Sequence, residues 1–301
     1  MSKIKILHLT DFHFSNDKKA VLEQNRLVEA LIKSLKAEKN KIDFLFFTGD
    51  LVDKGNKLKD FQDADLMLLQ KISDVLNIDK TNIFLCAGNH DVNRGQELDD
   101  INESISKIKD NDELDNYVLK QEGKSLKASL ENFNNFIAFQ NIFYLNHIAL
   151  GDKVDPLFST HIRDCNGHSI SISSINSAWR AIDSKTDSGN LLYPIHLLKE
   201  VSGKVKNDES FNIMLLHHPL SDFKYWNAQQ MENIIFKDFH VMFSGHTHKK
   251  RDTIHVVPEI GMYSCSSAAT LSHEKDAKIG YSIVKIDLEN FNLEIYNNIY
   301  Q

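Results

Sequence analysis

Strand-like and helix-like hydrophobic patterns alternate over the first ninety residues. Residues 3–10 alternate apolar with polar side chains, which predicts a β-strand. An amphipathic helix is predicted next, with Ser15 and Asn16 as candidate caps. The apolar positions that indicate this helix are Val21, Val28, Leu31 and Leu35.

Two further strands and a second helix complete this region. The run "IDFLFFTGD" is continuously apolar before its polar end, which is typical of a strand buried on both faces. The strand "NIFLCAGNHD" follows a second amphipathic pattern. That pattern is formed by Phe61, Ala64, Leu68, Ile72 and Val75. A β-α-β-α-β order predicts parallel strands joined by right-handed helical crossovers.

The pattern changes between residues 96 and 140. This stretch is polar and rich in acidic residues, as in "ELDDINES" and "DNDELD", and its periodicity is helical. Sequence on both sides is strand-rich. We therefore interpret residues 96–140 as a helical insertion, or cap, within one domain that spans residues 1–301.

The second half predicts further strands and one helix. Strands are predicted at 157–163 and 168–176, a helix near 194–201, and more strands in "FNIMLLHHP", "FHVMFSGHTH", "HVVPEIGMYSC", "YSIVKID" and "NLEIYNNIY". These strands predict a second sheet. The fold class expected from the pattern is therefore α/β.

Composition narrows the class of protein. The chain has 301 residues, 42% of them hydrophobic, and a formal net charge of −7. This acidic balance argues against a protein that binds long nucleic acid by general attraction. No stretch predicts a membrane span or signal peptide, and the three cysteines form no CxxC pair, so a cytoplasmic protein without a membrane partner is expected.

Polar side chains that can bind metals follow the ends of five predicted strands. The carboxyl ends of parallel strands share one edge of a sheet, so these side chains are expected to converge. Carboxylates, an amide and imidazoles without thiolate suit manganese, iron or zinc, and two ions that share one carboxylate would use the full set. The residues are Asp11, His13, Asp50, Asn89, His90, His217, His246 and His248.

The ordered motifs "DFH", "GDLVD", "GNHD", "HH" and "GHTH" resemble those of the calcineurin-like metallophosphoesterases. The resemblance covers the chain apart from the insertion, and it implies a two-sheet β-sandwich flanked by helices. It also implies two divalent metal ions. One would be bound by Asp11, His13 and His248, the other by Asn89, His217 and His246, with Asp50 bridging them.

The same resemblance suggests the catalytic residues. His90 stands beside the metal ligand Asn89, where it could protonate a leaving group. The resemblance points to Asp53 as the carboxylate that orients His90, although a simple turn residue is an alternative for Asp53. His218 is expected to face away from the metals if its strand stays extended, as a structural or supporting residue.

Departures from related motifs favour a small phosphodiester substrate. The chain has "GDLVDKG" and "GNHD" where Ser/Thr protein phosphatases carry G-D-x-x-D-R-G and GNHE. The segments "NSAW" and "HHPL" resemble class III cyclic-nucleotide phosphodiesterases. SbcD-like nucleases share the metal set, so a nuclease is the alternative, and a scaffold is a weaker one. Phosphate contacts are considered for Lys54, Arg94 and Arg180, with solvated surface roles equally open.

Overall fold

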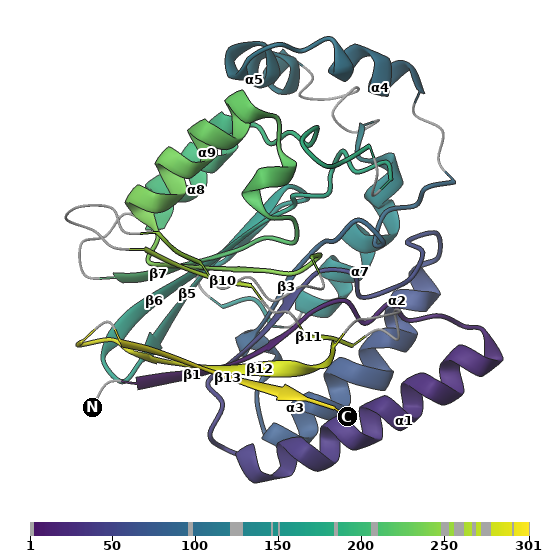
Figure 1. Cartoon of the computed structure of the whole chain (residues 1–301), viewed down its shortest axis with the longest axis vertical. Helices are drawn as coiled ribbons and strands as arrows, with labels where there is room; N and C mark the ends of the chain where they lie inside the picture. The colour runs from purple at the N-terminus through teal and green to yellow at the C-terminus, as the bar shows by residue number, and fades with distance from the viewer. Residues whose placement is uncertain are drawn as a thin grey trace.

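The computed structural model describes residues 3–300, apart from 96–98, 121–128, 146, 150, 184–185, 206–209, 248–252, 256–261, 267–268, 272–277 and 291. Two mixed β-sheets lie face to face, and helices cover their outer faces (Figure 1). This is the α/β sandwich that the sequence predicts.

The first sheet has the strand order β11-β12-β1-β2-β3, with β13 paired to β12. Strands β1, β2 and β3 are parallel, which confirms the predicted β-α-β-α-β unit. Strand β12 adds to β1 in the antiparallel sense. The strands are β1 (Lys3–Leu9), β2 (Phe44–Thr48), β3 (Ile83–Cys86), β11 (Ala269–Thr270), β12 (Lys278–Asp287) and β13 (Asn292–Ile299).

Helices cover the outer face of this sheet. They are α1 (Lys18–Leu35), α2 (Leu58–Ala64), the π-helical turn η2 (Asp65–Leu69) and α3 (Gln70–Leu76), with short 3₁₀ turns η1 (Lys36–Glu38) and η3 (Lys80–Asn82). Neither Ser15 nor Asn16 caps α1. The cap is Asp17, whose carboxylate accepts from the backbone amides of Lys19 and Ala20.

The second sheet has the order β4-β5-β6-β7-β8-β10-β9. Its strands are β4 (Lys153–Val154), β5 (Phe158–Cys165), β6 (His168–Ile175), β7 (Ser210–Leu215), β8 (Val241–Ser244), β9 (Thr253–His255) and β10 (Met262–Ser266). Helices α8 (Ile195–Val205) and α9 (Tyr225–Asp238) lie over its outer face (Figure 1). The 3₁₀ turn η5 (Leu220–Asp222) links β7 to α9.

Three features of the second half differ from the predicted pattern. Helix α9 was not predicted, and its buried positions are spread over a largely polar sequence. The segment expected as one strand in "HVVPEIGMYSC" contains the end of β9 and the start of β10, which pair antiparallel. Strands β12 and β13 return to the first sheet, so the second half does not build only its own sheet.

The continuous apolar runs have a simple explanation in the layered packing. Ile4, Ile6 and Phe46 point between the sheets and pack with Ile213 and Phe243 of the opposite sheet. Leu7, Leu9, Leu45 and Phe47 point the other way, into the core under the helices. Because both faces of β2 are buried, the residues on both faces of its central part are apolar.

The described part of residues 96–140 is helical and contains no strand. Its elements are α4 (Asp99–Ser106), α5 (Asn111–Lys120), η4 (Glu131–Phe133) and α7, which continues past the expected boundary (Asn134–Tyr144). Helices α4 and α5 lie beyond α8 and α9 (Figure 1), and Asp115 of α5 contacts His196 of α8 at 2.9 Å. The division into one domain with a cap stays a prediction. Among the described helices, none is both long and apolar enough for a bilayer.

Candidate metal centre

The predicted ligands converge where five strands end. Asp11 and His13 follow β1, Asp50 follows β2, Asn89 follows β3, and His217 and His246 follow β7 and β8. Four of these residues have left-handed backbone conformations, with φ of 55° at Asp11, 49° at His13, 57° at Asp50 and 68° at His246. Such angles are uncommon outside glycine and cluster at functional sites, where surrounding contacts hold the backbone in place.

Glycines precede three of the ligands and let the loops touch. A Cβ on Gly49 would lie 2.4 Å from Nδ1 of His217, and one on Gly88 would lie 2.2 Å from Oδ1 of Asp50. A Cβ on Gly245 would meet Oγ1 of Thr10 at 2.1 Å. The G-D, G-N and G-H pairs therefore have glycine for a packing reason, because a side chain at the glycine position would push the ligand loops apart.

Asp50 lies at the centre of the cluster. Its Oδ2 is 3.3 Å from Nε2 of His217 and 3.7 Å from Nε2 of His13, and Oδ1 of Asp11 is 3.8 Å from the same His13 nitrogen. The backbone N–H of His90 donates to Oδ1 of Asp50 at 2.7 Å. Asp50 thus faces histidines from both halves of the proposed site, which is the position a bridging carboxylate needs.

Asn89 joins the remaining histidines. Its Oδ1 lies 3.0 Å from Nε2 of His217 and 3.0 Å from Nδ1 of His246. These three side chains come from loops after three different strands, β3, β7 and β8. The amide oxygen and the two imidazole nitrogens point at one another, as they would around a shared ion.

Hydrogen bonding fixes which nitrogen of His217 faces the cluster. Nδ1 lies 2.7 Å from the carbonyl oxygen of Thr48, so Nδ1–H is the donor and Nε2 faces Asp50 and Asn89. Burial by itself lowers the pKa of His217, but the charge of Asp50 and its hydrogen bond raise it to about 9. Burial likewise opposes ionisation of Asp50, yet His217 and His13 hold the pKa of Asp50 below its ordinary value.

The donor set fits two divalent ions. Three groups among the described residues have ligand atoms within 4.8 Å of one another: Asp11, Asp50 and His217; His13, Asp50 and His90; and His217, His218 and His246. Asp50 belongs to the first two groups. Oxygen and imidazole ligands without thiolate match manganese, iron or zinc. His248, assigned to the first ion from the sequence, lies outside the described residues.

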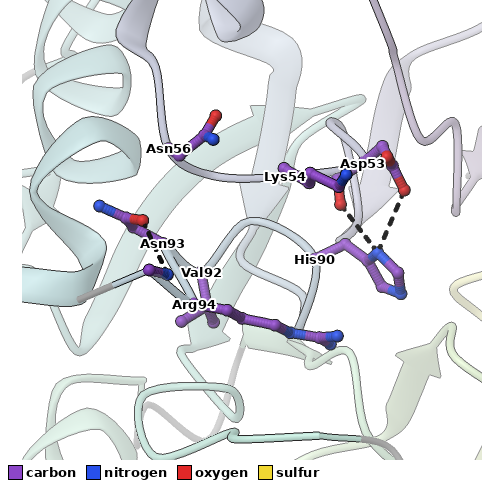
Figure 2. A pocket seen from close by; sticks show the side chains of 8 residues that line it. Asp53, Lys54, Asn56, His90, Val92, Asn93 and Arg94 are labelled. Atoms are coloured by element: carbon purple, nitrogen blue, oxygen red, sulfur yellow. Dashed lines mark hydrogen bonds and ion pairs between the residues drawn. The ribbon is translucent and has the colours of Figure 1, made fainter. Parts of the chain in front are cut away.

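His90 and Asp53 lie together beside this cluster. Nδ1–H of His90 donates to the backbone oxygen of Asp53 at 3.0 Å, and Oδ1 of Asp53 is 3.6 Å from the same nitrogen (Figure 2). Burial lowers the pKa of His90, but Asp53 and Asp50 outweigh it and raise the pKa above its ordinary value. Asp53 thereby engages Nδ1 of His90 and leaves Nε2 as the ring nitrogen outside this contact.

Asp91 is a supporting residue that the sequence analysis did not assign. Its Oδ2 accepts from the backbone N–H groups of Asp50 and Gly88, both at 2.9 Å, and Oδ1 accepts from that of Val52 at 3.1 Å. Asp91 is fully buried, and burial with the nearby charge of Asp50 raises the pKa of Asp91 to about 7. The available signal was its place as the last residue of "GNHD".

His218 does not face away from the site as expected. Strand β7 ends at Leu215, so the strict alternation of an extended strand no longer applies at His218. Its ring centroid lies 4.5 Å from that of His246 and 4.9 Å from that of His217. Burial, with the charges of His217 and His246, holds the pKa of His218 well below its ordinary value.

Asp222 is a second residue that local sequence did not indicate. Its Oδ2 lies 3.6 Å from Nε2 of His246, on the opposite side of the ring from the Nδ1 that faces Asn89. Burial raises the pKa of Asp222. A carboxylate behind a metal-binding imidazole fixes the orientation of the ring.

A cleft of about 180 Å³ lies next to His90. Lys54 and Arg94 line it with Asp53 and Asn93 (Figure 2). Nη2 of Arg94 donates to the backbone oxygen of Asn89 at 3.3 Å, which holds this cation near the ligand loop. Arg180 is different: it is buried against Trp179 and bonded to Asn102, which indicates a structural role.

A sequence model described as calcineurin-like phosphoesterase matches residues 4–250. The chain belongs to the calcineurin-like phosphoesterase family. The fold is therefore that of a calcineurin-like phosphoesterase, as the ordered motifs predict.

A curated relative agrees with the family of this calcineurin-like phosphoesterase. An uncharacterized metallophosphoesterase-like protein, YydB of Bacillus subtilis, is 25% identical over 256 residues, which cover 82% of this chain and 49% of YydB. This chain thus spans about half the length of that curated relative.

Two solved structures share the fold at low identity. The sulfate thiohydrolase SoxB of Thermus thermophilus matches with a TM-score of 0.52 and 11% identity, over 98% of this chain and 56% of SoxB. The purple acid phosphatase PPD1 of yellow lupin, Lupinus luteus, matches with a TM-score of 0.53 and 10% identity, over 100% of this chain and 53% of PPD1.

Proposed function

We propose that the protein is a phosphoester hydrolase that uses two divalent metal ions to cleave a small phosphodiester, with a cyclic or related signalling nucleotide as the preferred class. The observation that carries the proposal is the position of Asp50, whose Oδ2 faces His217 at 3.3 Å and His13 at 3.7 Å. When bound, the ions supply an activated water near neutral pH and neutralise charge on the phosphoryl group.

The residues of the chain divide this work between them. Asp11, His13 and His248 would hold one ion, and Asn89, His217 and His246 would hold the other, with Asp50 contributing to both. His90 delivers a proton to the departing oxygen from Nε2, because Nδ1 is engaged by Asp53. Lys54 and Arg94 present positive charge at the cleft, where a phosphate oxygen can accept hydrogen bonds.

The size and charge of the surroundings support a small substrate. The cleft beside His90 measures about 180 Å³, which accommodates a phosphate and part of its ester group. Exposed carboxylates of the insertion lie beside α8 and α9, where Asp110 and Asp112 line a separate hollow with Lys199, and we take this acidic element to face an approaching substrate. Negative charge on this element repels an extended polyanion more than a ligand with one phosphate.

A substrate panel tests the proposal. The protein is loaded with Mn²⁺, and kcat/KM is measured for cyclic nucleotides, a linear diester, a monoester and single-stranded DNA across a salt series. We expect cyclic nucleotides to be preferred, with a shallow salt dependence because one phosphate is contacted. Efficient DNA cleavage with a steep salt slope and negligible cyclic-nucleotide turnover would favour the nuclease alternative. Two bound metal ions without hydrolysis of any ester would favour a scaffold.

A further inference from the structure

Ser177 ties together the turn that follows β7. Its Oγ accepts hydrogen bonds from the backbone N–H groups of both His217 and His218, each at 3.1 Å. The same Oγ lies 3.1 Å from Nδ1 of His218. Ser177, His217 and His218 are all fully buried, so these partners cannot be exchanged for bulk water. The hydroxyl of Ser177 therefore holds the backbone of the proposed metal ligand His217 and orients the side chain of His218.

This arrangement determines the tautomer of His218. A hydroxyl oxygen has two lone pairs and one hydrogen. Both lone pairs of Ser177 are occupied by the two backbone donors, so the hydroxyl hydrogen is the atom directed at Nδ1 of His218. Nδ1 is then an acceptor, and the hydrogen of the neutral ring is on Nε2.

The Nε2 atom of His218 is buried and has no hydrogen-bond partner among the described residues. A buried N–H without an acceptor costs about 1–3 kcal/mol of stability. Buried N–H groups in native proteins therefore almost always have a hydrogen-bond acceptor. The ring packs beside the rings of His217 and His246, and one of its nitrogens lies within 4.8 Å of ligand atoms of both. Neither imidazole supplies the missing acceptor.

We propose that Ser177 and His218 form a positioning pair, in which the Nε2–H of His218 donates to an oxygen held at the His217 and His246 metal position. That oxygen belongs either to water or to the substrate's phosphate. His218 is thus a neutral donor and not a further metal ligand. The inference rests on the proposed two-metal site, but the tautomer can be measured independently of hydrolysis.

Long-range ¹H–¹⁵N NMR of the histidine rings gives the first test. We expect Nε2 of His218 to carry the hydrogen and Nδ1 to be bare, both before and after Mg²⁺ or Zn²⁺ is added as a diamagnetic metal. A hydrogen on Nδ1, or loss of the Nε2 hydrogen when metal binds, would overturn the assignment. If the wild-type protein bound no metal at all, the two-metal function would fail while the metal-free tautomer remained measurable.

Two amide variants of His218 test the roles of its two ring nitrogens separately. His218→Asn keeps an oxygen acceptor near the Nδ1 position and removes the Nε2 donor, whereas His218→Gln keeps a donor near Nε2. We expect His218→Asn to fold and to bind either Mn²⁺ or inorganic phosphate roughly tenfold more weakly than the wild type. His218→Gln should bind both with an affinity closer to that of the wild type. Calorimetry with Mn²⁺ alone and with inorganic phosphate added to the Mn²⁺-loaded protein identifies the acceptor.

A loss in the Mn²⁺ titration assigns the acceptor to water, and a loss confined to phosphate assigns it to the phosphate oxygen. Unchanged affinity in both titrations for His218→Asn would refute the donor role. Ser177→Ala provides the companion measurement. It should weaken Mn²⁺ binding as well, because the His217 backbone loses its acceptor, and an unaltered Mn²⁺ affinity would refute the pairing.

Discussion

The imidazole of His217 connects the two sheets: its Nδ1–H donates across 2.7 Å to the carbonyl oxygen of Thr48, 169 residues earlier in the chain. His217 follows β7 in the second sheet, and Thr48 ends β2 in the first. This contact directs Nε2 of His217 at Asp50 and Asn89. The geometry of the metal centre therefore depends on how the two sheets are packed.

Replacing Asp50 by asparagine should remove the bridge with little disturbance of the loop. Asparagine tolerates the left-handed backbone at this position, where φ is 57°, and its oxygen can still accept from the N–H of His90. We expect the metal content to fall from two ions to at most one, and hydrolysis to fall at least ~10²-fold. Elemental analysis and circular dichroism check this, with Asp112→Asn on α5 as a charge-matched control. Two tightly bound ions in Asp50→Asn would contradict the bridging role.

Metal binding should release a proton from His217. The pKa of His217 is raised to about 9 in the metal-free protein, so the ring is protonated at neutral pH and must lose the Nε2 proton to bind an ion. Apparent Mn²⁺ affinity should therefore rise with pH, by ~10-fold per unit below pH 9 for one proton.

Calorimetry in buffers of different ionisation enthalpy measures this proton release directly. The acid limb of hydrolysis should also move to lower pH when more Mn²⁺ is added, because metal and protons compete for the same nitrogen. If the acid limb of the pH profile did not move with Mn²⁺ concentration, the titration of another group would be its cause.

His90→Asn should lower turnover most for esters whose leaving group is a weak acid. General acid assistance contributes ~10²–10⁴ in rate, so esters with poorly acidic leaving groups should lose most, and nitrophenyl esters should be nearly spared. The raised pKa of His90 extends to higher pH the range in which the acid is protonated, and turnover of the poor esters should fall on the alkaline side as that proton is lost. Equal losses for both kinds of ester, with two metals retained, would exclude the assignment.

Asp222→Asn should weaken metal binding although it alters no proposed metal ligand. The variant removes the carboxylate charge that faces Nε2 of His246 at 3.6 Å, and such supporting carboxylates are worth ~10–100-fold in metal affinity. Mn²⁺ titration measures the loss. Ser188→Ala is the matched control, because Ser188 contacts the other oxygen of Asp222, at 3.5 Å. A similar loss in both variants would indicate a general disturbance of the loop.

Asp91→Asn should destabilise the folded protein. Asp91 accepts from the N–H groups of Asp50, Gly88 and Val52, and the amide nitrogen of asparagine would face at least one of these donors. Each buried donor left without an acceptor costs ~1–3 kcal/mol. The free energy of unfolding, from urea titration of the metal-free protein, should fall by ~2 kcal/mol or more. An unchanged unfolding midpoint would show that these hydrogen bonds are replaced by others.

The sequence by itself determined the first three strands and the side-chain chemistry gathered at their ends. Phe44 and Phe46 alternate with Leu45 and Phe47 along β2 because both faces of that strand are buried, and its continuously apolar sequence indicates this burial. Polar residues at strand ends then predicted one common edge, because parallel strands finish on the same side of a sheet. Asp50, Asn89 and His217 lie together as this argument expects.

Only the tertiary structure decided how that edge is supported. The hydrogen bond between His217 and Thr48, the approach of Asp222 to His246 and the return of β12 to β1 join residues that are distant in sequence. Local periodicity reports which face of an element is buried, but not which partner covers it. His218 shows this limit most clearly: its direction depends on where β7 ends and on the single hydroxyl of Ser177.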